Sequence, residues 1–336
     1  MIKVSFVIGA YNAQDLILMP LRSIYESGLP EEEFEVIVVD DCSSDNTVKV
    51  CEEFSRTHGN YLLIRQEKNH KLGAARNRGL RAARGVYVQF VDADDEIGDE
   101  FLQALNEALL NEVDVQKNDA LIQRLGDDWE RVSTDGGIQL VMPASSFCEE
   151  VYSTAPHYGG AAFYLWRRQY LEKMSHPFIE NRLMEDIDWV EYHLAHAEVI
   201  GCCNSVTYKY YINGNSITHK PSIRTLSDYV LQCYRRIKGQ ELYKDTLPVF
   251  SEKIYSYCIM RINSLLRYRH LTKFRKKDFP IMYASIGDDV RKDLLSYKFS
   301  PFATFCLRHK SMTIFILSVS CIMARVGRRI VQIHRT

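Results

Sequence analysis

Apolar runs and helical repeats alternate four times along the first 110 residues. Runs rich in β-branched and aromatic residues predict buried strands at "KVSFVIGAY", "FEVIVVD", "NYLLIRQ" and "VYVQFVD". Each run is followed by apolar residues at helical spacing, in "AQDLILMPLRSIYES", "TVKVCEEFSRTHG", "KLGAARNRGLRAARG" and "GDEFLQALNEALLN". The last of these helices is expected to be capped near Asp99. This alternation predicts βαβ units, and therefore a parallel sheet with helices on both faces.

The pattern weakens after Asn111. Residues 112–145 are mixed and polar, so we expect short strands and a loop there. Farther on, "RLMEDIDWVEYHLAHA" predicts a helix and "SVTYKYYINGNSIT" a strand followed by a loop. From Ile223 onward the chain is predicted to be helical, and the segment "YCIMRINSLLRYRHLTKFRKK" is markedly basic.

The net charge of −1 conceals an acidic body and a basic tail. Asp293 is the last acidic residue, and seven Lys and Arg residues follow it. The near-neutral total gives no whole-chain argument for a nucleic-acid partner. Nine cysteines without a CxxC pair favour reduced thiols and a cytosolic protein. The N-terminus lacks a signal-peptide pattern, so we expect it to form the first strand.

The most apolar segment of the tail is "MTIFILSVSCIMA", Met312 to Ala324. It is shorter than the roughly 18 apolar residues that usually span a bilayer. Arg308, Lys310 and Arg325 flank it, and such basic flanks favour an amphipathic helix lying at an anionic membrane surface. The alternative is a buried C-terminal helix. We expect a peripheral location at the cytoplasmic face of the cell membrane.

Acidic residues follow two of the predicted strands. Asp40 and Asp41 end the second strand, and Asp92, Asp94 and Asp95 end the fourth. Ligands of parallel α/β sheets bind at the carboxyl ends of the strands. Carboxylates one residue apart in a turn suit Mg²⁺ or Mn²⁺, which prefer oxygen ligands. A solvated acidic turn before a helix is the alternative for either group alone, but their clustering at one edge costs repulsion unless a cation or hydrogen-bond donors offset it.

Four ordered motifs, "VSFVIGAYNA", "VVDDCSSDNT", "NHKLGAARNRGL" and "VQFVDADD", resemble those of the inverting, nucleotide-sugar-dependent glycosyltransferases of family 2, of the bacterial surface-polysaccharide type. The resemblance is strong over about residues 1–110 and continues weakly to about residue 220. It implies an α/β architecture of the GT-A type, a Rossmann-like and mostly parallel sheet with flanking helices. We therefore expect a GT-A domain at residues 1–220, with a nucleotide-binding half at 1–110 and an acceptor half at 111–220. A helical, basic C-terminal region is expected at residues 221–336.

The resemblance also implies which residues contact the donor. Tyr11 and Asn12 would lie beside the nucleobase, whose N–H would be accepted by Asp41, while Asp40 would orient the turn. Asp94, together with Asp92, would bind the metal ion. Arg76 would either support the diphosphate or hold one of the clustered aspartates. The donor-side residues that the resemblance implies, besides those named above, are Gly73, Arg76, Asn77, Asp92 and Ala93.

On the acceptor side, "ENRLMEDIDW" matches the family's Glu-Asp pair at a helix start. The resemblance implies that Asp186 is the catalytic base, with Glu185 as its support or as the alternative base. Trp189 would line the sugar site, with a place in the core as the alternative. Acidic residues also suit a helix N-terminus without any catalytic role. Ile212 stands where the family commonly has arginine, and His219 follows in the same loop.

The function implied is transfer of a sugar from a nucleoside-diphosphate sugar, by default a UDP-sugar, to a glycan or lipid-linked glycan. Mg²⁺ or Mn²⁺ would assist. Two alternatives are a sugar-nucleotide-binding protein without activity and a nucleotidylyltransferase. The latter, like a Rossmann dehydrogenase, is disfavoured because "GAYNAQD" lacks a glycine-rich phosphate loop. A zinc site at His193 and His196 is disfavoured because "HLAH" lacks the four-residue spacing of a zincin helix.

Overall fold

The computed structural model divides into two compact units, Met1–Gly214 and Asn215–Thr336, which we call the sheet unit and the helical unit. The division lies a few residues before the boundary expected from the sequence. The structure describes residues 1–124, 127–132, 140–152, 160–212, 222–266 and 278–308.

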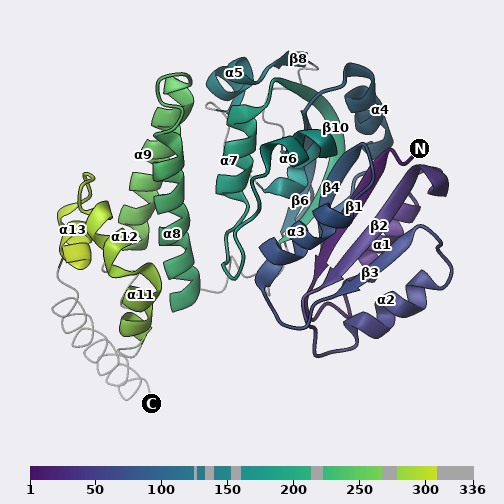
Figure 1. Cartoon of the computed structure of the whole chain (residues 1–336), viewed down its shortest axis with the longest axis horizontal. Helices are drawn as coiled ribbons and strands as arrows, with labels where there is room; N and C mark the ends of the chain where they lie inside the picture. Colours follow the sequence, from purple (N-terminus) through teal and green to yellow (C-terminus); the bar gives the residue numbers. More distant parts are fainter. Residues whose placement is uncertain (125–126, 133–139, 153–159, 213–221, 267–277, 309–336) are drawn as a thin grey trace. The chain divides into compact units, whose positions relative to one another are not determined.

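The sheet unit is built on one ten-stranded mixed sheet (Figure 1). The strand order is β3-β2-β1-β4-β9-β6-β10-β5, with β7 beside β6 and β8 beside β10. The first four strands are parallel, while β9 runs antiparallel between β4 and β6. The strands are β1 Val4–Ala10, β2 Phe34–Asp40, β3 Tyr61–Arg65, β4 Tyr87–Asp92, β5 Glu96–Ile97, β6 Val115–Arg124, β7 Glu130–Val132, β8 Leu140–Pro143, β9 Tyr164–Arg167 and β10 Val199–Ile212.

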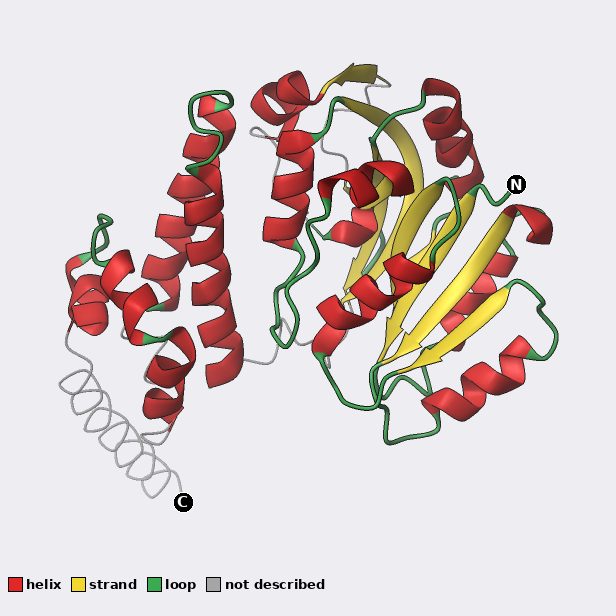
Figure 2. Ribbon diagram, in the orientation of Figure 1, coloured by secondary structure: helices red, strands yellow, loops and turns green. Residues whose placement is uncertain are grey.

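Helices cover both faces of this sheet (Figure 2). Phe6 and Ile8 of β1 belong to the core formed with α1, α2 and α4, whereas Val7 and Gly9 face α3. Strands buried on both faces read as continuous apolar runs, which explains why β1 and β2 lack polar alternation. The helices are α1 Leu18–Tyr25, α2 Thr47–Ser55, α3 Lys71–Ala82, α4 Phe101–Asn111, α5 Ala144–Ser146, α6 Arg168–Met174 and α7 Ile187–His196, with short helices η1 Glu31–Glu33, η2 Phe147–Tyr152 and η3 Ala161–Phe163.

The structure corrects three details of the sequence interpretation. The first helix begins at Leu18 rather than near Ala13, because the intervening residues form turns. Asp99 does not cap α4, because its carboxylate accepts a hydrogen bond from Lys209 Nζ at 2.8 Å. The sheet is less parallel than expected, since residues 112–145 and their successors contribute antiparallel strands.

In the described part of the helical unit, helices pack around α8. Helix α8 contacts both α9 and α11, and its N-terminus is capped by Ser222, whose Oγ accepts a hydrogen bond from Thr225 N at 3.0 Å. The Arg236 guanidinium lies 4.8 Å from the Tyr257 ring of α9, a cation–π contact between the two helices. The described helices are α8 Ile223–Gln240, α9 Pro248–Leu265, α11 Asp278–Ile286, α12 Asp288–Leu294 and α13 Pro301–Arg308.

Among the residues that the structure describes, no helix has both the length and the apolar character required to cross a membrane. The apolar segment Met312 to Ala324, for which the sequence favoured an interfacial helix, lies outside the described residues.

Close packing of α3 on β1 generates a stability prediction. A Cβ atom on Gly79 would lie 2.2 Å from Cγ1 of the buried Val7, whose branched side chain has little freedom to move. We expect Gly79→Ala to lower the free energy of unfolding by about 1–3 kcal/mol, measured by urea denaturation. Gly59→Ala is the control, because nothing lies within 4 Å of its added Cβ. Equal stability of the two variants would contradict the packing argument.

Candidate active site

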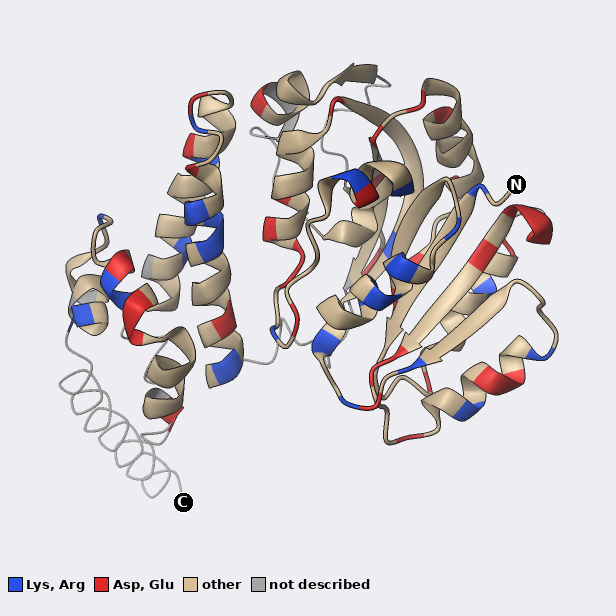
Figure 3. Cartoon of the chain, viewed as in Figure 1, with Lys and Arg blue, Asp and Glu red and all other residues tan. Residues whose placement is uncertain are grey.

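Three parallel strands of the sheet unit end at one edge. In register, Ala10 of β1 lies beside Asp40 of β2, and Gly9 lies beside Asp92 of β4. The residues that follow these strands are therefore brought together, as the sequence predicted. Figure 3 marks the acidic residues where β2 ends. This edge is where ligands of α/β sheets bind.

The buried side chain of Arg76, from α3, lies at the centre of this edge. Its Nη2 donates a hydrogen bond to Asp92 Oδ1 at 2.8 Å, and its Nη1 donates to Glu185 Oε1 at 2.7 Å. Asp186 Oδ2 lies 3.7 Å from the same Nη1. One guanidinium thus joins the end of β4 to the residues that begin α7. We call Arg76, Asp92, Glu185 and Asp186 the Arg76 cluster.

The Arg76 cluster holds three carboxyl groups against one positive charge. Burial alone would oppose the charge of Arg76, but Asp92, Glu185 and Asp186 outweigh this effect and raise the pKa of Arg76. Burial raises the pKa of Glu185 to about 7, although Arg76 opposes the shift, and burial likewise raises the pKa of Asp186. The cluster therefore favours taking up a proton near neutral pH.

Glu185 and Asp186 differ in accessibility. The Glu185 side chain is 7% exposed and is committed to Arg76, whereas the Asp186 side chain is 21% exposed. Asp186 is the N-cap residue of α7, yet its side chain makes no capping hydrogen bond. Helix capping thus does not account for this aspartate. A Cβ atom on Gly160 would lie 3.3 Å from Asp186 Oδ2, so a glycine borders the carboxylate.

The aspartates that end β2 hold two loops in place. Asp41 accepts hydrogen bonds from His70 N at 2.7 Å, Lys71 N at 2.8 Å and Gln66 Nε2 at 3.0 Å. Burial raises the pKa of Asp41, and these backbone donors counteract part of the shift. Asp40 Oδ2 accepts from Ser43 N at 3.1 Å. Its Oδ1 is buried and has no hydrogen-bond partner among the described residues.

Tyr11 is the most exposed aromatic side chain at this edge, at 51%, and the Lys71 ammonium lies 5.9 Å from its ring. Asn12 Oδ1 accepts a hydrogen bond from Ser44 N at 2.8 Å, which fixes the loop after β1 on the loop after β2. Left-handed backbone conformations concentrate here, a pattern typical of functional sites. The non-glycine residues with positive φ are Asn12 and Cys42 in these two loops, Lys71 at the start of α3, and Asn181 and Met184 in the segment before α7.

Two residues of α3 position the segment before α7. Asn77 donates to Phe178 O at 2.9 Å and to Glu180 Oε1 at 3.0 Å, and accepts from Phe178 N at 2.9 Å. Both amide hydrogens are used, so the side chain has no N–H left for a sugar nucleotide. A Cβ atom on Gly73 would lie 2.3 Å from Ile179 O. Both residues therefore lie against the segment that leads to Glu185.

The expected acceptor-side role of Trp189 is corrected. Its side chain is 1% exposed, stacks on Phe178 with ring centroids 4.0 Å apart, and donates its N–H to His176 O. It cannot line a sugar site from within the core. The neighbouring His193 is also buried, and its Nδ1 lies 2.9 Å from Trp189 O. His219 lies outside the described residues.

The turn after β4 carries a third aspartate, to which the sequence assigned no separate role. Asp95 is fully buried, and its Oδ2 accepts a hydrogen bond from the Tyr208 hydroxyl at 2.8 Å. Tyr208 lies on β10, more than a hundred residues later. The signal available in the sequence was the alternation of tyrosines in "VTYKYY", which places Tyr208 and Tyr210 on one face of a strand.

Asp92 and Asp94 have the chemistry of a divalent-cation site. Both carboxylates are partly exposed, and oxygen ligands suit Mg²⁺ and Mn²⁺. In the described part of the chain, no three His, Cys, Asp or Glu residues converge closely enough to hold a metal ion by themselves. Mg²⁺ is commonly bound by one or two carboxylates together with substrate phosphates, so this pair fits an ion shared with a diphosphate.

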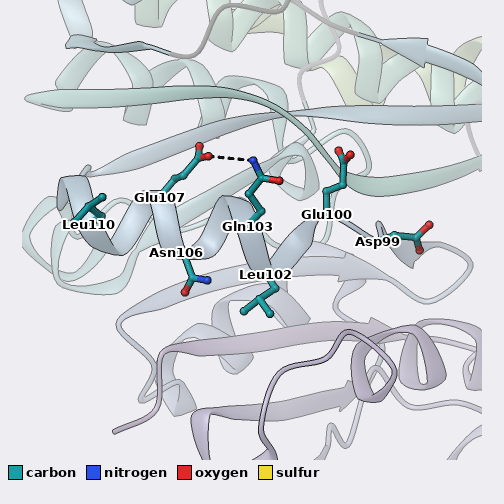
Figure 4. Close-up of a pocket in the computed structure, with 7 residues that line it drawn as sticks. All are labelled: Asp99, Glu100, Leu102, Gln103, Asn106, Glu107 and Leu110. Carbon is teal, nitrogen blue, oxygen red and sulfur yellow. Dashed lines mark hydrogen bonds between the residues drawn. The ribbon is translucent and has the colours of Figure 1, made fainter.

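Two surface hollows of the sheet unit lie apart from the Arg76 cluster. One, of about 700 Å³, is lined mainly by α1 and β5, including Arg22, Glu96 and Lys209. The other, of about 520 Å³, follows the outer side of α4, where Gln103 donates a hydrogen bond to Glu107 (Figure 4). No residue of the Arg76 cluster lines either hollow. The second hollow is lined by Asp99, Glu100, Leu102, Gln103, Asn106, Glu107 and Leu110.

Residues 5–136 match the family model described as glycosyl transferase family 2. This part of the chain belongs to that family. The match includes the strand ends that carry Tyr11, Asp41 and Asp92, and it confirms the family predicted from the sequence. We refer to residues 5–136 as the family 2 domain.

Known relatives extend the likeness beyond the family 2 domain. An uncharacterized glycosyltransferase of Escherichia coli K12, YibD, is 28% identical over 76% of this chain and 74% of its own length. A poly(ribitol-phosphate) beta-glucosyltransferase of Bacillus spizizenii is 39% identical, but over only 30% of this chain. The match covers 16% of that relative's length.

The crystal structure of S. aureus TarS 1-349 in complex with UDP-GlcNAc resembles this chain with a TM-score of 0.63. The two chains are 19% identical, and the likeness covers 97% of this chain and 92% of that one. At this identity the likeness establishes the fold. It confirms the predicted GT-A architecture with a helical C-terminal region.

The raised pKa of Glu185 predicts a pH-dependent stability. Between its ordinary value of 4.5 and its folded value of about 7, the folded protein holds a proton that the unfolded chain releases. Stability from this group is therefore present at low pH and lost as pH rises through this window, by at most about 3 kcal/mol.

Glu185→Gln has no such proton to lose. We expect its unfolding free energy, relative to wild type, to rise between about pH 5 and about pH 7.5, measured by urea denaturation in EDTA. Glu198→Gln, at an acid whose side chain is 78% exposed, is the control. Parallel pH profiles for wild type and Glu185→Gln would contradict the shifted pKa.

Proposed function

We propose that this protein is an inverting glycosyltransferase, which transfers a sugar from a nucleoside-diphosphate sugar to a hydroxyl group of a glycan or lipid-linked glycan. The observation that carries the proposal is the Arg76 cluster. It joins the donor edge of a family 2 domain to a helix start that presents the partly exposed Asp186.

The loops after β1 and β2 are proposed to bind the nucleoside. The exposed ring of Tyr11 is a surface on which a nucleobase can stack. The unpartnered Oδ1 of Asp40 and the remaining acceptor capacity of Asp41 suit the N–H of a base. A UDP-sugar is the first choice of donor, since TarS 1-349, which shares the fold, was crystallised with UDP-GlcNAc.

Asp186 is proposed as the general base. As the acceptor oxygen attacks the anomeric carbon, its proton passes to the Asp186 carboxylate. The new bond from carbon to acceptor oxygen forms while the bond to the diphosphate oxygen breaks, so the configuration inverts and a nucleoside diphosphate leaves. The ion pair between Glu185 and Arg76 fixes the guanidinium, which in turn keeps the neighbouring Asp186 in place.

Asp94 and Asp92, in the turn that also contains Ala93, are proposed to hold Mg²⁺ or Mn²⁺ at the diphosphate. Such an ion, when bound, would neutralise the charge that develops on the leaving diphosphate. Arg76 donates to Asp92 Oδ1 and so fixes the direction in which this carboxylate points.

We expect Asp186→Asn to lower the rate of transfer by about 10²–10⁴-fold, because the amide cannot take up the acceptor proton. The assay follows nucleoside-diphosphate release from a panel of sugar nucleotides with Mn²⁺ and a glycan acceptor. Donor binding, measured by thermal stabilisation, should persist in the variant. Asp188→Asn, in the first turn of the same helix, is the matched control and should stay near wild type.

The outcomes of this assay separate the alternatives. Undiminished transfer by Asp186→Asn would show that another group is the base. A wild type that binds sugar nucleotides but never releases the diphosphate would be a binding protein. Release of pyrophosphate from a nucleoside triphosphate and a sugar phosphate would instead identify a nucleotidylyltransferase.

A peripheral membrane location is proposed on the basic composition of the tail. Seven Lys and Arg residues and no acidic residue follow Asp293, and Figure 3 shows further basic residues on α8 of the helical unit. An anionic surface attracts each such charge by about 1 kcal/mol. A lipid-linked acceptor would be met at that surface.

Replacing Arg325, Arg328 and Arg329 together by glutamine in the full-length protein tests this location. We expect binding to vesicles containing phosphatidylserine to weaken on the order of 100-fold, since three charges contribute about 1 kcal/mol each. Cosedimentation at low salt measures it, with neutral vesicles as the control. Full-length wild type that fails to bind anionic vesicles would refute the proposal.

A further inference from the structure

One phenol contacts both ends of the turn that carries Asp92 and Asp94. The Tyr208 hydroxyl accepts a hydrogen bond from Asp92 N at 3.1 Å and donates one to Asp95 Oδ2 at 2.8 Å. Asp92 and Asp95 are also joined directly, since Asp95 N donates to Asp92 O at 3.2 Å. Residues 92–95 therefore form a hydrogen-bonded turn, and its first and last residues both bond to the Tyr208 hydroxyl group.

The last residue of this turn is fixed from a second direction. Asp95 Oδ1 accepts a hydrogen bond from Tyr211 N at 2.9 Å, so the buried carboxylate receives donors from two residues of β10. Beyond the turn, β5 pairs with β10, with Ile97 opposite Tyr208. The turn is thus anchored on β10 by side-chain and main-chain bonds.

We propose that Tyr208 and Asp95 are positioning residues for the divalent-cation site, and that they act by holding the turn from Asp92 to Asp95 in its binding conformation. This inference rests on the proposed function, in which Asp92 and Asp94 hold Mg²⁺ or Mn²⁺ at a diphosphate. Neither Tyr208 nor Asp95 contacts the ion or the substrate, because both side chains are buried.

We call Tyr208 and Asp95 the Tyr208 brace. Its hydrogen bonds act on the part of the chain that orients the carboxylates of Asp92 and Asp94. Asp92 is the first residue of the turn and Asp94 the third, so the relative direction of their side chains is set by the backbone of the turn. The bond from Asp92 N to the phenol fixes the peptide that precedes Asp92. Removing the hydroxyl frees this peptide and leaves Asp95 Oδ2 without its donor in a buried position.

The test is Tyr208→Phe, with Tyr87→Phe as the matched control. Both tyrosines are 1% exposed in the same sheet, and each hydroxyl group lies within hydrogen-bond distance of two partners. Tyr87 bonds to Ala108 O and Val113 O, away from the turn. If the Tyr208 hydroxyl had only a structural role, the two variants would therefore show the same Mn²⁺ affinity.

The readout is calorimetric titration of MnCl₂ into the full-length protein saturated with UDP, without any acceptor. Partners that orient metal ligands typically contribute 10–100-fold to metal affinity, so we expect Tyr208→Phe to weaken Mn²⁺ binding by that factor. Tyr87→Phe should bind Mn²⁺ within about twofold of wild type, although both variants should melt at lower temperature.

Equal Mn²⁺ affinity in Tyr208→Phe and wild type would overturn the inference while leaving the proposed function intact. If wild type and both variants give no heat with Mn²⁺ and any of the nucleoside diphosphates, the proposed metal site fails and the brace with it. If Tyr208→Phe does not fold, Asp95→Asn replaces it, since it keeps the side-chain volume. It should weaken Mn²⁺ binding at least about tenfold, and unchanged binding would overturn the inference.

Discussion

The site of this protein depends on a single buried positive charge. A guanidinium removed from water is stable only when carboxylates surround it, and those of the Arg76 cluster come from β4 and from the start of α7. Each of these groups would be costly to bury alone. The requirement that Arg76 be neutralised therefore brings Asp92 and the proposed base together, although Asp92 and Glu185 are 93 residues apart in the sequence.

Local patterns were sufficient for the parts of the fold that depend on neighbours in sequence. The strands that end at Ala10, Asp40 and Asp92 are continuous apolar runs, and acids stand at the ends of the last two, so their positions and their common edge could be predicted. The motifs that identify the family lie in the same region. The antiparallel strands could not be placed, because β9 contains only four residues and its pairing is decided by distant partners.

In the candidate site too, some features could be predicted from local sequence and others depend on contacts between distant segments. Asp186 follows from a local motif, but the commitment of Glu185 to Arg76 depends on how α3 packs on the segment before α7. Trp189 was misjudged for a related reason. An aromatic residue one turn after a predicted base fits either a sugar site or a core, and only the rings of Phe178 and Phe90 around it decide between them. The Tyr208 brace likewise joins segments too distant for any local pattern to connect.

The place of β9 has a practical consequence for protein engineering. Residues Tyr164–Arg167 insert between β4 and β6, so the strand that pairs with β4 on this side of the sheet is encoded more than seventy residues after β4. The first 110 residues therefore cannot be exchanged between relatives as an independent segment. A chimera that grafts them onto a relative would inherit a foreign strand at the centre of its sheet. Shuffled libraries should exchange residues 164–167 together with the N-terminal segment.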